Sequence, residues 1–142
     1  MKKLILLALL LLAGQCNAQK WVQVAETRTL LPLGRSVIEV NDSSIRVLDG
    51  YRRAWVRNSH TPAKQSSTGV EEGMGSSMTL NLIDCKNEEM ALMQYVEYPE
   101  KAGGGDVGYS AIFTREMTLS KMITPIPGTV NDATMQHICS FL

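Results

Sequence analysis

Apolar and polar positions alternate in short runs along most of the chain, and this period of two predicts β-strands. Side chains two residues apart lie on the same face of a strand, so each run can turn its apolar residues toward a core. Clusters of turn-forming residues separate the runs. The expected strands are residues 20–28, 35–40, 44–48, 51–57, 77–85, 90–98 and 109–117.

Two of these strands are expected to form a hairpin. Asp49 and Gly50 stand between the extended runs 44–48 and 51–57. An Asp-Gly pair in that position is a strong signal for a tight turn between antiparallel strands. The turn therefore predicts that the two runs pair directly.

The strand 51–57 presents a mixed face that is a candidate for binding a partner. Its period of two places Tyr51, Arg53, Trp55 and Arg57 on one face and residues 52, 54 and 56 on the other. One interpretation buries Trp55 and lays the arginine stems over it. The other exposes the aromatic and arginine side chains, which are enriched at binding hot spots.

The segment from residue 58 to residue 78 has a different composition. It is rich in Ser, Thr, Gly, Pro and Glu and shows no apolar period, so it is expected to be a long loop that includes His60. Long loops in small domains are uncommon and often functional, although a plain hairpin connection fits equally well.

The C-terminal segment changes to a helical pattern. Thr129 follows Pro127-Gly128 and is a good N-cap for a helix that continues without a breaker. Helical spacing groups a set of side chains on one side, namely Val130, Ala133, His137 and Phe141, with Ile138 beside them. We expect this helix to dock on the sheet.

The N-terminus has the pattern of a secretory signal peptide. Two lysines precede the apolar run from Leu4 to Ala13, which is too short to span a bilayer. Cleavage is expected after Ala18, so residues 1–18 would be the signal peptide and residues 19–142 a single domain. Cys16 allows a second interpretation, in which it is a lipidated cysteine that anchors the protein.

Export changes how the remaining cysteines are interpreted. Only Cys85 and Cys139 follow residue 18, and an even pair of cysteines in an oxidising compartment is expected to form a disulfide. This bond would join the end of strand 77–85 to the last turns of the helix. It would also consume both thiols as nucleophiles.

Charge and motifs exclude several classes of function. The chain has 14 Lys and Arg against 14 Asp and Glu, so it lacks the basic excess of a nucleic-acid-binding protein. Its two histidines, His60 and His137, are far apart in sequence, and no Cys-x-x-Cys motif accompanies them. We therefore predict no metal site, no cofactor, no catalytic residue and no retained transmembrane helix.

Several landmarks occur in an order that resembles the surface-adhesin protein E-like family of small exported proteins from Gram-negative bacteria. They are the signal sequence, Trp21-Val22, Asp42-x-Ser44-Ile45, Trp55-Val56, Asp84-Cys85, Pro127-Gly128-Thr129 and Cys139. The resemblance implies an α+β fold, with an antiparallel sheet of about six strands and a C-terminal helix packed on it. It also implies one disulfide, between Cys85 and Cys139.

Two hypotheses about function follow. The first is a non-enzymatic exported protein that binds proteins, an adhesin for host extracellular-matrix or serum proteins as the resemblance implies. The alternative is a periplasmic inhibitor or regulator of an envelope enzyme, or a small envelope enzyme itself. Either protein would reside in the periplasm or at the outer-membrane surface of a Gram-negative bacterium.

Overall fold

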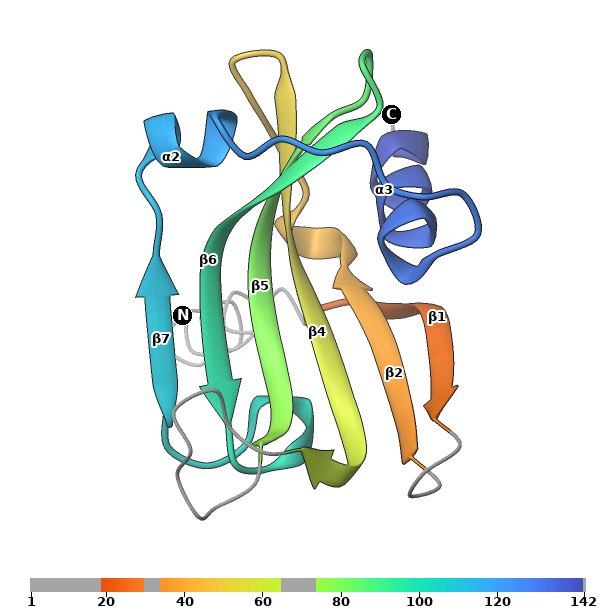
Figure 1. Cartoon of the computed structure of the whole chain (residues 1–142), viewed down its shortest axis with the longest axis vertical. Coiled ribbons are helices and arrows are strands. Elements are labelled where there is room, and N and C mark those ends of the chain that lie inside the picture. The colour runs from red at the N-terminus through yellow and green to blue at the C-terminus, as the bar shows by residue number, and fades with distance from the viewer. Residues whose placement is uncertain (1–18, 30–33, 65–73, 142) are drawn as a thin grey trace, which may run out of the picture.

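The fold is one antiparallel sheet with a C-terminal helix packed on it (Figure 1). The computed structural model describes residues 19–29, 34–64 and 74–141, so the predicted signal peptide lies outside the described residues. The strands are β1 (Trp21–Thr29), β2 (Gly34–Asn41), β3 (Arg46–Leu48), β4 (Tyr51–Lys64), β5 (Met74–Asp84), β6 (Glu89–Tyr98) and β7 (Tyr109–Ile112). The helices are α2 (Arg115–Leu119) and α3 (Val130–Ser140), with the 3-10 turns η1 (Asp42–Ser44) and η2 (Lys101–Gly103).

The strand order is β1-β2-β4-β5-β6-β7, and β3 pairs with β4 beside this row. The predicted α+β class, antiparallel sheet and helix are confirmed, with seven strands in place of about six. The β3–β4 hairpin is also confirmed. Asp49 and Gly50 form its turn with φ angles of 50° and 85°, the left-handed backbone that such a turn requires.

The predicted loop 58–78 is wrong over much of its length. Strand β4 continues to Lys64 and β5 already begins at Met74, so most of the polar segment is paired sheet. Asn58 pairs with Ser77, and Ser59 with Ser76, across the two strands. Strand segments made of polar residues show no apolar alternation, so their sequence resembles that of a loop. They are strands here because the neighbouring strands supply their hydrogen-bond partners. The remaining part of the predicted loop, residues 65–73, lies outside the described residues.

The predicted strand 109–117 is right only in its first half. Strand β7 ends at Ile112, and α2 begins at Arg115. The side chain of Thr114 accepts a hydrogen bond from the backbone N–H of Met117, which makes it the N-cap of α2. A local capping interaction therefore ends the extended run where the alternation alone would continue it.

Helix α3 closes the core against one face of the sheet, here called the α3 face. The buried cluster comprises Ile38, Val40, Ala54, Val56, Ile83, Met90, Met135 and Ile138. The predicted helix and its Thr129 cap are confirmed. Its predicted apolar side is right only in part. Ile138 is buried and Val130 packs against the core, but Thr134 and Met135 are the other buried residues, and His137 contacts the η1 turn.

The Cys85–Cys139 disulfide is confirmed, with an S–S distance of 2.02 Å and Cα atoms 5.6 Å apart. It joins the end of β5 to the last turn of α3. Figure 1 shows α3 at one side of the sheet, where it contacts β1 most and also β2, β4 and β5. The part of the α3 face over β6 is left for other elements, and α2 contacts β6 there.

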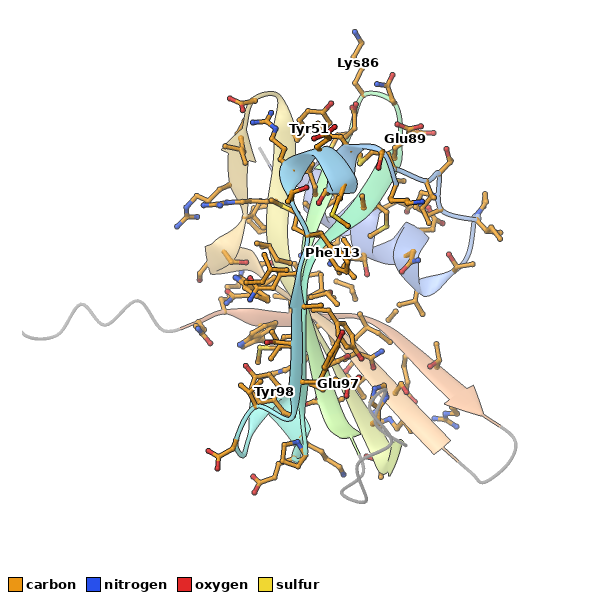
Figure 2. The ribbon with its side chains drawn as sticks, turned by 60° about the vertical axis from the view of Figure 1, so that its left-hand side comes forward. Tyr51, Lys86, Glu89, Glu97, Tyr98 and Phe113 are labelled. Carbon is orange, nitrogen blue, oxygen red and sulfur yellow. A yellow bond between two sulfur atoms is a disulfide. The ribbon has the colours of Figure 1, made fainter. Side chains whose placement is uncertain are left out.

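The face of the sheet away from α3 is here called the opposite face. Strand alternation and register place Tyr98 on the opposite face and its neighbour Glu97 on the α3 face. Figure 2 shows this division, with Glu97 and Phe113 on the side of α3 and Tyr98 on the other. The two faces carry different candidate sites.

Candidate functional site

The predicted binding residues lie on the opposite face of β4, because the core uses Ala54 and Val56 from the same strand. Arg53 is exposed, while Tyr51 and Trp55 are half-buried. The backbone N–H of Trp55 donates to Ser44 Oγ over 2.9 Å, which ties this part of β4 to the η1 turn. The structure thus brings the aromatic and arginine side chains onto one face, as the period of two predicts.

Arg57 has a different environment from Arg53. Its guanidinium lies 4.3 Å from the centre of the Trp21 ring and binds Glu39 Oε2 from Nε and Nη2 at 2.9 and 2.8 Å. The Arg57 side chain is only 13% exposed. A guanidinium held by a cation–π contact and a carboxylate holds β1, β2 and β4 together. Arg57 therefore supports the predicted face, and Arg53 and the aromatic residues remain available on it.

His60 is buried in β4, which corrects its predicted place in a loop. Its Nδ1 lies 2.8 Å from Ser36 Oγ, in a hydrogen bond on the α3 face. Ser36 is buried as well. His60 also lines the cleft described below, and its hydrogen bond with Ser36 holds β2 and β4 together.

His137 forms a second polar cluster at the edge of α3. Asp42 accepts a hydrogen bond from His137 Nε2 at 2.8 Å and pairs with Lys20 Nζ at 3.0 Å. Burial opposes ionisation of Asp42, but the bonds from His137 and Lys20 outweigh it and lower the pKa of Asp42 below its usual value. The cluster links the start of β1, the η1 turn and α3.

Asp84 has a structural role at the end of β5. Its carboxylate accepts hydrogen bonds from the backbone N–H groups of Asn87 and Lys86 at 3.1 and 3.0 Å. The Asn87 side chain also donates to it, at 2.8 Å. These bonds lower the pKa of Asp84, the backbone bond from Asn87 contributing most. The Asp-Cys landmark therefore combines a turn cap with a disulfide.

A cleft of about 690 Å³ opens on the α3 face, and the sequence did not point to it. Its floor comes from β4, β5 and β6, and its walls from α3, α2 and the segment between these helices. Thr118 Oγ1 donates to the backbone oxygen of Leu92, and Met90 and Ile123 exchange two backbone hydrogen bonds, at 2.9 and 3.0 Å. These bonds hold the wall against β6. One sequence feature is related to the cleft. The alternation of residues 77–85 places the polar side chains of Thr79 and Asn81 on the same face as Cys85, and both line the cleft.

The described residues contain no cluster of three or more His, Cys, Asp or Glu side chains that could hold a metal ion. Among the helices in the described ranges, none is long and apolar enough to cross a membrane.

The sequence model of the surface-adhesin protein E family matches residues 21–140. The chain belongs to this family. The match spans all the described strands and both helices, so the family assignment applies to the whole fold. The protein is accordingly an adhesin-type surface protein at the level of its family.

Solved structures with a similar fold include protein E of Haemophilus influenzae. Crystal form II has a TM-score of 0.55 at 15% identity, covering 83% of this chain and 89% of that one. Protein E from non-typeable Haemophilus influenzae gives a TM-score of 0.53 at 12% identity, covering 89% and 78%. At these identities the likeness shows the fold alone. No curated protein sequence matches the chain.

Proposed function

We propose that this protein is an exported, non-enzymatic adhesin that binds a host extracellular-matrix or serum protein at the outer-membrane surface. The observation that carries the proposal is the match to the surface-adhesin protein E family over residues 21–140. The chemistry of the described residues agrees with a binding role. Both cysteines after residue 18 form a disulfide, and the two histidines are held in structural contacts.

The opposite face of β4 is the proposed contact surface. It presents exposed Arg53 beside the half-buried rings of Tyr51 and Trp55. Leu80 pairs with Trp55 across the sheet and extends the apolar area of this face. A cationic side chain among aromatic and apolar residues is the composition typical of binding hot spots. Arg57 contributes through its contacts with the Trp21 ring and Glu39, which hold β1, β2 and β4 together.

Surface plasmon resonance of the exported protein over immobilised basement-membrane extract and serum proteins tests this proposal. We expect saturable binding, and Arg53→Ala should weaken it at least about fivefold, a loss of about 1 kcal/mol. Lys86→Ala is the matched control, because Lys86 is an exposed cation in the β5–β6 turn, where it extends past the end of the sheet and does not lie on this face (Figure 2).

The two parts of the proposal fail in different ways. Saturable binding that Arg53→Ala leaves unchanged would remove this face and keep the adhesin. No binding to any matrix or serum protein would contradict the adhesive function itself.

A further inference from the structure

The cleft on the α3 face has apolar walls that remain partly open to solvent. Phe113 and Leu92 line it on the β6 side, and Val130 on the α3 side. Met117 and Ile123 stand at its rim with 52% and 57% of their surface exposed. Its volume of about 690 Å³ falls within the range of ligand-binding pockets. The walls are suited to apolar side chains, and methionine adapts to their shape.

The floor of the cleft is polar and carries amide and hydroxyl groups. Asn58 from β4 and Asn81 from β5 bring two amide side chains to the floor, and Asn131 brings a third from the α3 wall. Thr79 and Tyr95 also line the cleft, and the Tyr95 hydroxyl donates to Glu97 Oε1 over 2.8 Å. An amide side chain offers a donor and an acceptor in the arrangement of a peptide group, so it can bond a main chain without reading its sequence.

One of these amides has a hydrogen-bonding capacity that the fold does not use. Asn58 Oδ1 is buried and makes no hydrogen bond within the described part of the chain. A buried acceptor without a partner is unfavourable, because it has lost its hydrogen bonds to water. Its amide plane can turn about the last side-chain bond toward the cleft, where a donor N–H would satisfy it. Asn81, in contrast, already donates to Thr79 Oγ1 over 2.8 Å.

The charge of the cleft narrows the class of ligand. Among the described residues that line it, Lys121 at the rim is the only lysine or arginine, and it is exposed. The apolar walls disfavour a glycan, which carries hydroxyl groups on most of its surface, and the amide floor disfavours an acyl chain, which offers it no hydrogen bonds. An uncharged peptide with apolar side chains satisfies both the walls and the floor.

We infer that the α3-face cleft binds an extended, uncharged peptide segment, with its main chain on the amide floor and its apolar side chains against the walls. The segment would belong to a partner protein. This site lies on the other side of the sheet from the proposed adhesive face, and it does not depend on that proposal.

Isothermal titration calorimetry of the exported protein with the capped peptide acetyl-VSLSV-amide tests the inference. We expect saturable binding with a dissociation constant below about 1 mM. Sodium dodecanoate and chitotriose serve as the acyl-chain and glycan probes, and neither should displace the peptide. Failure of the peptide to saturate, or binding of either other probe in its place, would overturn the inference.

Two variants locate the binding in the cleft. Asn58→Leu keeps the side-chain size and removes the amide, so peptide affinity should fall at least about fivefold. Phe113→Ala shortens a wall outside the buried core cluster and should give a similar loss. An acyl-chain site would respond in the opposite sense to Asn58→Leu, because leucine enlarges the apolar lining.

Gln136→Ala is the matched control, since Gln136 is an exposed amide on α3 that does not line the cleft. Thermal unfolding followed by circular dichroism confirms that each variant is folded. Folded variants of Asn58 and Phe113 that both retain full affinity would contradict a peptide site in this cleft.

Discussion

At the scale of single residues, charged side chains near the sheet edges act as links between distant segments. Asp42 binds Lys20 and His137, from two distant parts of the chain, and its side chain is only 6% exposed. Since an ionised carboxylate only accepts hydrogen bonds, His137 Nε2 and Lys20 Nζ are the donors. The η1 turn therefore depends on a negative charge at this position.

Asp42→Asn is expected to lower the free energy of unfolding by about 1–3 kcal/mol at pH 7. Because the folded pKa of Asp42 lies below its unfolded value, its contribution is present above the unfolded pKa and is lost as pH falls through the folded pKa. The difference between wild type and variant should therefore shrink as the pH falls below the ordinary pKa of an aspartate. Urea denaturation at several pH values measures it.

Asp106→Asn is the control, because Asp106 is an exposed residue that precedes β7. Its substitution should leave the unfolding free energy nearly unchanged at every pH. A difference between Asp42→Asn and wild type that stays constant down to pH 2 would contradict the role assigned to ionised Asp42.

Arg57 and Arg53 lie four residues apart on β4, and their substitutions are expected to affect stability to different extents. Arg57→Ala removes the contact with the Trp21 ring and both bonds to Glu39, and is expected to cost about 1–3 kcal/mol. Arg53→Ala, at an exposed position, should change stability by less than about 0.5 kcal/mol. Urea unfolding of both variants measures the two changes in unfolding free energy. Equal changes would contradict the structural role assigned to Arg57.

At the scale of elements, the attachment of α3 combines packing, charge and a covalent bond. Met135 and Ile138 pack into the core, and Arg52 Nη1 donates to the backbone oxygens of Ile138 and Cys139 at 2.7 and 3.1 Å. These bonds satisfy carbonyl groups that the end of a helix leaves unpaired. The disulfide adds its constraint at the same turn of the helix.

Removal of the disulfide is expected to cost about 4 kcal/mol in the chain-entropy model, since its cysteines are 54 residues apart. The double variant Cys85→Ala, Cys139→Ala should therefore unfold at a much lower temperature than the oxidised wild type. Wild type unfolded under reducing conditions is the control and should approach the double variant. Equal midpoints for oxidised wild type and double variant would show that packing alone holds α3.

Sequence patterns predicted the strands that have an apolar face. They did not predict the parts of strands in which the paired residues on both strands are polar. Strands β1, β2 and β6 were expected close to their observed bounds. The last part of β4 and the first part of β5 were missed, because polar residues such as Ser59 and Ser76 pair there and give no apolar alternation. Their hydrogen bonds come from neighbouring strands, which local sequence does not reveal.

At the scale of the whole molecule, the two faces of one sheet support separate proposals. The opposite face carries the adhesive surface proposed around Arg53, and the α3 face carries the cleft. Since β4 contributes to both, alternate residues of one strand serve different surfaces. Substitutions at Arg53 and Asn58 should therefore act independently, each on its own ligand.

Export is the remaining prediction at this scale. The mass of the protein recovered from the cell envelope should correspond to a chain that starts at Gln19, with both remaining thiols blocked until reduction. Intact mass spectrometry before and after reduction and alkylation measures this. A lipid mass on Cys16 would instead indicate a membrane anchor, and a chain that starts at Met1 would contradict cleavage.

The sequence by itself determined the class of fold, the tight turn at Asp49-Gly50, the cap at Thr129 and the cysteine pair. Each follows from local backbone preference, from apolar period or from the count of thiols. Tertiary structure alone decided which face of β4 meets the core, how far the polar strands extend, and where the cleft opens. These features depend on pairing and packing between segments distant in sequence, which a local pattern cannot report.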